Sequence, residues 1–97
     1  MFRIIRVSGD SMWPRFRSGD YVVVLAGPLA RPVREGDVVV FRDDEGRLKL
    51  KRLAGLLEGD VAVVDSLNPE APVIPPFPKD RLAGRVVWHI KAGRPLR

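Results

Sequence analysis

The sequence of 97 residues contains no cysteine and a single histidine, His89, and these shortages exclude several kinds of chemistry. A chain without cysteine forms no disulfide and offers no thiolate to a metal ion, and one histidine is too few for the usual zinc site. We therefore expect neither a metal nor another cofactor. No segment approaches the roughly 18 consecutive apolar residues that a membrane-spanning helix requires.

Lysine is also scarce, because most of the 17 basic residues are arginines. Arginine stays protonated in proteins, so the candidates for a general base are His89 and the lysines. The lysines are Lys49, Lys51, Lys79 and Lys91. Serine is a poor nucleophile until a neighbouring base takes its proton. If the chain carries out nucleophilic catalysis, its composition therefore favours a serine paired with a lysine.

The remaining composition is that of a globular protein, with 45% hydrophobic and 30% charged residues. We expect one domain over residues 1–97, located in the cytoplasm, because residues 1–7 lack the long apolar stretch of a secretory signal. The net charge of +5 would suit an acidic partner, and contact with an anionic membrane surface is compatible with it. The arginines are scattered without a dense block, however, so we do not expect nucleic-acid binding.

Most of the chain is predicted to form short strands, several of which follow a Gly-Asp turn. Glycine permits the turn, aspartate bonds back to nearby amides, and valine favours the pleated strand that follows. The predicted strands cover residues 1–7, 21–25, 38–42, 47–50, 61–64 and 84–91. Residues 68–78 contain five prolines and are expected to form an extended loop. We predict a mainly β fold, a small coiled and partly open barrel with at most one short helical turn, after Pro14.

A hairpin between residues 38–42 and 47–50 places the lysines of the second strand. Strand alternation turns Leu48 and Leu50 toward the core and puts Lys49 and Lys51 on the other face. We expect Lys51 to end its strand, with a turn over residues 52–55. Burial in an apolar pocket and a neighbouring positive charge would lower the pKa of such a lysine toward the range of a general base.

A fourth Gly-Asp pair, Gly9-Asp10, differs from the other three because it leads into Ser11 rather than into a β-branched run. A glycine two residues before a serine lets the backbone turn sharply. Such a turn can expose the hydroxyl and aim amide N–H groups at one point, as an oxyanion hole requires. Turns of Gly, Asp and Ser are among the commonest surface loops, so by itself this segment would be interpreted as a structural turn.

Several sequence blocks, taken in order, resemble a known group of serine peptidases. The blocks are Gly9-Asp10-Ser11-Met12-Trp13-Pro14, Gly19-Asp20-Tyr21-Val22, Gly36-Asp37-Val38-Val39 and Lys51-Arg52-Leu53. In this order they resemble the LexA-like and signal peptidase-like serine peptidases, families S24 and S26. Residues 66–72 and 84–88 look like the C-terminal half of the LexA branch, so the resemblance covers nearly the whole chain.

The resemblance implies a barrel of the LexA and signal peptidase type and a Ser/Lys dyad, with Ser11 as nucleophile and Lys51 as general base. Such a dyad hydrolyses a peptide bond of a protein or peptide substrate through an acyl-enzyme. Signal peptidases often carry a serine two positions before the nucleophile, where this chain has Gly9. The oxyanion is therefore expected to rest on backbone amides that include that of Ser11.

The chain also departs from both branches of the resemblance. The Gly-Asp-Asn block of signal peptidases is at best a remnant at residues 64–68, and their Ser-x-Asp-Ser-Arg block is missing. The LexA branch cleaves its own chain upstream of the serine, yet here only ten residues precede Ser11. We therefore expect cleavage of a separate substrate, as in maturation or signal-peptide processing. The alternative is a catalytically idle dimerisation or regulatory module of the LexA C-terminal type, with an exposed C-terminal strand favouring a homodimer.

Other side chains leave further alternatives open. Lys49 is the rival base, although the block match favours Lys51. We expect His89 to be a partly exposed structural histidine, since it alternates with the apolar positions of its strand, but a triad with Asp10 or Asp65 remains open.

The apolar side chains beside the serine also have two possible roles. Met12 and Trp13, together with Phe16, are candidates for a lip that contacts substrate or membrane. Core packing after a turn is the commoner use of such side chains, and we rank it first.

Overall fold

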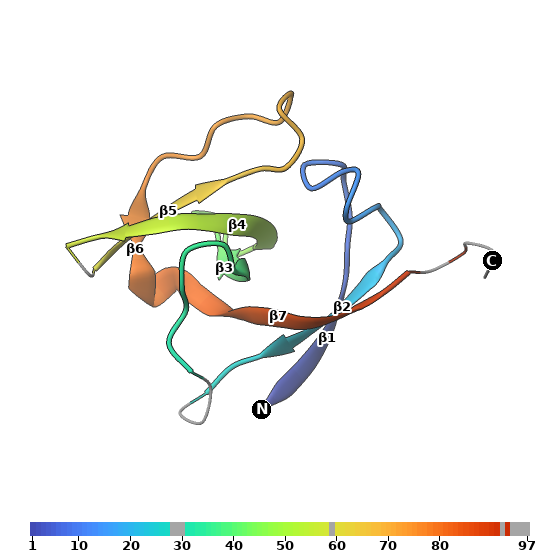
Figure 1. Ribbon diagram of the computed structural model, residues 1–97, viewed down its shortest axis with the longest axis horizontal. Helices are drawn as coiled ribbons and strands as arrows, with labels where there is room; N and C mark the ends of the chain where they lie inside the picture. The colour runs from blue at the N-terminus through green and yellow to red at the C-terminus, as the bar shows by residue number, and fades with distance from the viewer. Residues whose placement is uncertain (28–30, 59, 92, 94–97) are drawn as a thin grey trace.

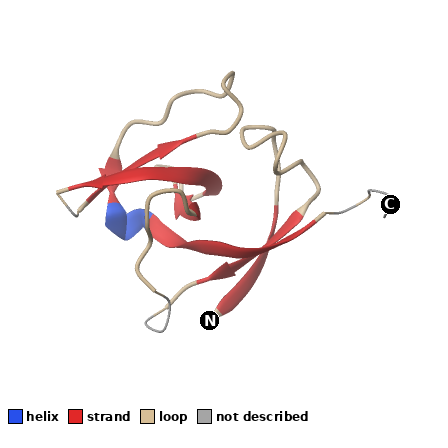
Figure 2. Ribbon diagram, in the orientation of Figure 1, coloured by secondary structure: helices blue, strands red, loops and turns tan. Residues whose placement is uncertain are grey.

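The computed structural model describes residues 1–27, 31–58, 60–91 and 93. Their strands form one curled antiparallel sheet (Figures 1 and 2). Its elements are β1 (Phe2–Arg6), β2 (Tyr21–Leu25), β3 (Val38–Arg42), β4 (Leu48–Leu57), β5 (Val61–Asp65), β6 (Phe77–Pro78), the short 3-10 helix η1 (Lys79–Arg81) and β7 (Leu82–Ile90). The strand order is β1-β2-β7-β3-β4-β5-β6, and the sheet forms an open half-barrel. The predicted mainly β, partly open barrel is confirmed.

The helical turn does not lie where it was predicted. Within the described ranges the helical turn is η1, whereas residues 11–16 after β1 form hydrogen-bonded turns. The amide of Phe16 donates to the carbonyl of Met12 at 3.0 Å, but Pro14 has no N–H and the pattern does not continue. Among the described residues, no helix has the length and apolarity needed to cross a membrane.

Strand β4 is longer than predicted and carries Lys51 in its interior. The strand pairs with β3 as far as Arg52 and with β5 from Arg52 onward, so the expected turn over residues 52–55 is wrong. The register shifts between Leu53 and Gly55, which allows the strand to bend as it changes partner. The proline-rich segment is a loop as predicted until its last two residues, which form β6 at the edge of the sheet.

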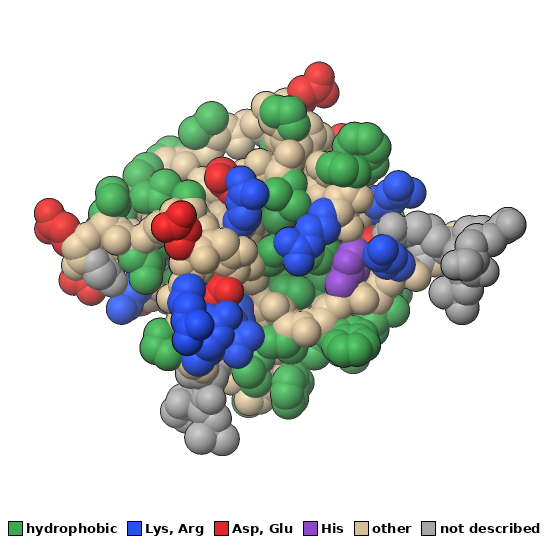
Figure 3. Space-filling view, viewed as in Figure 1, with side chains coloured by type: hydrophobic (Ala, Val, Ile, Leu, Met, Phe, Trp, Pro, Cys, Tyr) green, Lys and Arg blue, Asp and Glu red, His purple; other side chains and the backbone are tan. Residues whose placement is uncertain are grey.

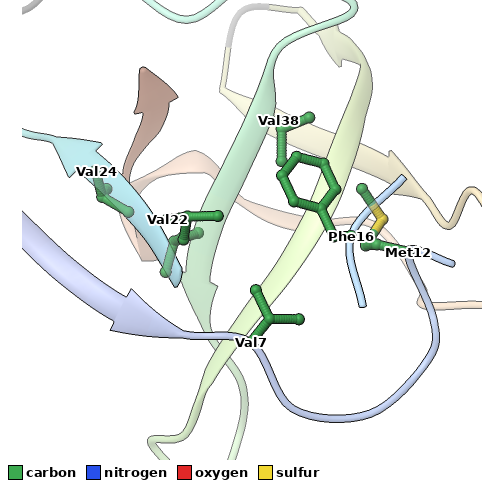
Figure 4. Close-up of a cluster of buried hydrophobic side chains, with 7 residues drawn as sticks. Val7, Met12, Phe16, Val22, Val24 and Val38 are labelled. Atoms are coloured by element: carbon green, nitrogen blue, oxygen red, sulfur yellow. The ribbon is translucent and has the colours of Figure 1, made fainter. Parts of the chain in front are cut away.

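The hydrophobic core consists of two clusters on opposite faces of β3. Val38 and Val40 belong to the first cluster, and Val39 and Phe41 belong to the second. The first cluster also receives side chains from the loop that joins β1 to β2, as Figure 4 shows. Its buried members are Val7, Met12, Phe16, Val22, Val24, Val38 and Val40. Because β3 is covered on both faces, the β1–β2 loop is seated on a rigid part of the sheet.

A bulge in the pairing of β2 with β7 changes which side chains of β7 face outward. Val24 pairs with Val86, but Val23 pairs with Trp88, so one residue of β7 is extra. Val86 packs against the first cluster, whereas the side chain of Trp88 is 67% exposed. His89, expected to lie opposite the apolar side, instead points toward the loop between β1 and β2.

Candidate active site

Ser11 lies in the loop between β1 and β2, and this loop is closed at its base by backbone hydrogen bonds. The amide of Val7 donates to the carbonyl of Asp20 at 2.7 Å, and the amide of Gly19 donates to Val7 at 2.8 Å. Gly9 has a φ of +80°, a conformation that favours glycine over other residues. The predicted glycine turn thus brings the partly exposed Ser11 back over the first core cluster.

The same loop is fastened to the segment that follows β5. The Asn68 amide donates to the carbonyl of Ser11 at 2.9 Å, and the Asn68 side chain donates to the carbonyl of Asp10 at 3.0 Å. Figure 1 shows these two loops next to each other at the same end of the sheet. The backbone on both sides of the Asp10–Ser11 peptide is therefore held by one asparagine.

Lys51 is buried, with 5% of its surface exposed, in the part of β4 that pairs with β3, opposite Val39. Its Nζ donates a 2.6 Å hydrogen bond to Ser66 Oγ. Burial lowers the pKa of the Lys51 amine below its ordinary value, and the charge of Lys49 lowers it further. No ion pair found in the described ranges includes Lys51. The site therefore makes the neutral amine, which is the form that can accept a proton, easier to reach than it is for a lysine in solvent.

Ser11 and Lys51 line the same pocket, whose volume is about 390 Å³. Its lining includes aliphatic side chains from β1 to β4 and from the serine loop, among them Ile5, Val7, Val22, Val40 and Leu50. An apolar wall next to a hydroxyl and a buried amine strengthens electrostatic interactions, because little water competes. The two residues that the resemblance pairs are thus brought to one cavity from different elements.

The other lysine and the apolar neighbours of Ser11 have different environments. Lys49 is 47% exposed and lies 3.7 Å from Asp43, which makes it a solvated lysine. Met12 is buried in the first cluster and also lines the pocket, whereas Trp13 is 51% exposed and lies outside the pocket lining. Phe16 is a core residue. Of the suggested lip, only Met12 contributes to the pocket, and it does so as part of the wall.

His89 is engaged with an aspartate other than the two considered from the sequence. Its Nε2 lies 2.7 Å from the carboxylate of Asp20, which is 1% exposed. The ring also contacts Phe16, with 4.5 Å between ring centroids, while Asp65 is bound by Arg52. The histidine therefore supports the serine loop. In the described part of the chain no cluster of His, Asp or Glu has the arrangement of a metal site.

Sequence analysis assigned no role to Ser66 and Asn68, which contact the two candidate catalytic residues. The signals for them were the remnant of a signal peptidase block at residues 64–68 and the block of residues 66–72, which resembles the LexA branch. Ser11 lies far from Asn68 in the chain, and Ser66 meets Lys51 because β4 pairs with β5 beyond the predicted end of the strand, so spacing alone could not reveal the contacts.

Comparison with known proteins identifies the family. A family model described as Peptidase S24-like matches residues 2–87, which include Ser11, Lys51, Ser66 and Asn68. Comparison with curated protein sequences gave no match. Since the match spans most of the length and the fold is the expected half-barrel, the chain belongs to the S24-like peptidase family.

Proposed function

We propose that the protein is a serine endopeptidase in which Ser11 is the nucleophile and Lys51 the general base. The observation that carries this proposal is the buried Lys51 amine in the wall of the pocket that Ser11 also lines. A lysine can serve as a base at moderate pH only where its pKa is lowered, and burial among apolar side chains supplies that condition.

The reaction would begin when the neutral Lys51 amine takes the proton of the Ser11 hydroxyl as Oγ bonds to the substrate carbonyl carbon. The backbone amide of Ser11 would donate to the oxyanion that forms. The C–N bond then breaks, and the leaving amine receives the proton held by Lys51. A water molecule, deprotonated by the same lysine, would hydrolyse the acyl-enzyme. The hydrogen bond to Ser66 would keep the amine oriented throughout.

The sheet supports an extended substrate. Strand β1 is the terminal strand of the sheet, and residues 48–51 of β4 pair with β3 but with no described strand on their other side. Unpaired strand edges offer N–H and C=O groups to a peptide that adds as a further strand. The pocket is lined by residues of both edges, Ile5 and Arg6 from β1 and Leu48 to Lys51 from β4. A separate protein processed at one bond, as in maturation, suits this arrangement.

The proposal is tested by incubating the protein with a diverse peptide mixture and identifying new termini by mass spectrometry. Cleavage should increase with pH and disappear in Ser11→Ala and Lys51→Met. Lys79→Met, in an exposed segment away from the pocket, is the matched lysine control and should cleave as the wild type does. Cleavage that persists in Ser11→Ala would refute the assigned nucleophile.

A second candidate function, a regulatory module without catalysis, is favoured by a different surface. The outer face of β1, β2 and β7 exposes Phe2, Ile4, Trp88 and Ile90 at 43% or more. Register places Ile4 and Trp88 on either side of Val23, so the exposed side chains form one face. A second copy of the chain would cover such a face in a symmetric dimer. Dimerisation that Trp88→Glu abolishes, with no cleavage in any mixture, would favour this function.

A further inference from the structure

We propose that the peptide recognised in this pocket alternates apolar and acidic side chains next to the bond that is cut. The inference builds on the proposed function, since it concerns the pocket that Ser11 and Lys51 line. It depends on how β1 and β4, the two strand edges at the pocket, distribute their side chains between the faces of the sheet.

On β1, the alternation separates apolar side chains from a basic one. Ile5 packs against the first core cluster, and Val7, just beyond the strand, belongs to that cluster. Arg6 lies between them in the sequence, is exposed, and lines the pocket. Successive residues of a strand point to opposite faces, so the apolar and basic sides of this edge are one residue apart.

On β4, the same division is repeated. Leu48 and Leu50 pack against the first core cluster, whereas Lys49 is exposed. Arg47, which precedes the strand, shares the parity of Lys49 and is also exposed. Among the residues that line the pocket, both edges thus turn aliphatic side chains toward the first cluster and cationic side chains away from it.

The charges at the pocket have one sign. Every charged residue among those that line it is basic, namely Arg6, Arg47, Lys49 and Lys51. Two of these have acidic partners outside the lining: Arg47 is paired with the exposed Glu45, and Lys49 lies 3.7 Å from Asp43, whose side chain is 14% exposed. The exposed Arg47 pair is of a weak kind, the Lys49 contact is long, and no described ion pair contains Arg6. The cationic side of the pocket can therefore accept carboxylates.

An extended peptide between the two edges presents its own side chains alternately to the two faces. One set meets the aliphatic wall formed by Ile5 and Leu50, where small or branched apolar groups would be buried. The other set meets the basic side, where aspartate or glutamate would form charge-assisted contacts with Arg6 and Lys49. A basic side chain in that set would be repelled.

Binding to the Ser11→Ala variant tests this inference separately from catalysis. The probes are three fluorescent peptides in which valine alternates with aspartate, asparagine or lysine. We expect the aspartate peptide to bind roughly tenfold more tightly than the lysine peptide, with asparagine between them. The difference should shrink as salt is added, because exposed charges are screened.

A charge reversal at the pocket and a matched one away from it identify the residues responsible. Arg6→Glu, introduced with Ser11→Ala, should lower the preference for aspartate by a factor of about three, whereas Arg3→Glu should leave it unchanged. Arg3 is an exposed residue of the same strand that does not line the pocket. Equal binding of the three peptides, tighter binding of the lysine peptide, or no binding of any of them would overturn the inference.

The two proposals fail in different ways. If Ser11→Ala prefers the aspartate peptide but the wild type cleaves none, the recognition surface is upheld and the peptidase function is refuted. If the wild type cleaves valine peptides irrespective of their alternate residues, the peptidase function is upheld and the acidic preference is refuted.

Discussion

Lys51 holds its amine where a positive charge is disfavoured, and this has a consequence for stability as well as for reactivity. The amine is buried beside aliphatic side chains, and its pKa lies below the ordinary value of 10.5 because of burial and the charge of Lys49. Between the lowered pKa and 10.5, the unfolded chain binds more protons than the folded one, so stability rises with pH across that window. At pH values below the lowered pKa, the Lys51 amine is charged in the folded protein, and burying that charge lowers the free energy of unfolding by its full amount.

Replacing the amine with an apolar group should therefore stabilise the protein. We expect Lys51→Met to increase the free energy of unfolding near neutral pH by about 0.5–2 kcal/mol, as loss of an active-site polar group often does. The gain should diminish as the pH rises from the lowered pKa toward 10.5, because the amine is neutral in both states only above 10.5. Urea unfolding at several pH values measures this, and a variant less stable than the wild type at neutral pH would contradict the assigned cost of burial.

Lys49 should influence the pKa of the general base, Lys51, without acting as the base itself. Removing its charge in Lys49→Met raises the pKa of Lys51, because the repulsion that lowers it is lost. With an uncharged peptide substrate, cleavage near neutral pH should fall about twofold and recover at alkaline pH. The measurement is kcat/KM against pH. An unshifted profile, or complete loss of activity at all pH values, would contradict this role.

The loop between β1 and β2 depends on one buried carboxylate. Asp20 accepts a 3.0 Å hydrogen bond from the Arg17 amide, and its oxygen lies 2.7 Å from His89 on β7. Removing a buried group leaves its partners unsatisfied. We expect Asp20→Ala to lower the free energy of unfolding by about 1–3 kcal/mol and to reduce cleavage. Asp44→Ala, which alters an exposed pair with Arg81, is the control and should change stability by less than about 0.5 kcal/mol.

Thermal unfolding of the two variants and of His89→Gln checks this prediction. Glutamine can still donate to Asp20, so His89→Gln should be milder than Asp20→Ala. If Asp20→Ala were as stable as Asp44→Ala, the carboxylate would not be what holds the loop.

The strands themselves could be predicted because their pattern is local. Alternation and Gly-Asp turns indicated β2, β3 and β5 within a residue of their observed ends. The predictions were wrong where pairing with another strand determines the end of a strand or the direction of a side chain. β4 continues past Arg52 because β5 pairs with it there, and the bulge opposite Val23 turns Trp88 outward.

The candidate site was predictable to the same extent. The ordered blocks indicated Ser11 and Lys51, but the contacts that support them join distant segments. Ser66 reaches Lys51, and His89 reaches Asp20 across 69 positions, only because the sheet brings those strands together. Such contacts follow from the strand order, which no local pattern reveals.

On the face of the molecule in Figure 3, positive charge is spread rather than concentrated. Figure 3 shows Lys and Arg side chains distributed over the visible face among hydrophobic side chains, with one closer group near its lower edge. Some of the basic residues are paired, including Arg31 with Asp37 and Arg52 with Asp65. On the face shown, the basic side chains of the described residues therefore do not form a continuous track for a phosphate backbone.

We accordingly expect only weak, non-specific binding of duplex DNA, lost at about physiological salt. Fluorescence anisotropy with a labelled duplex at low and moderate salt measures this. Micromolar or tighter binding that survives physiological salt would show that the scattered arginines act together after all.

The most direct measurement of the proposed dyad is covalent labelling of Ser11 by a serine-reactive fluorophosphonate, followed by intact mass and peptide mapping across pH. The dyad predicts one adduct, on Ser11, whose rate of formation rises with pH and which is absent from Ser11→Ala and strongly slowed in Lys51→Met. No adduct on the folded wild type at any pH, or labelling that is unchanged in Lys51→Met, would contradict it.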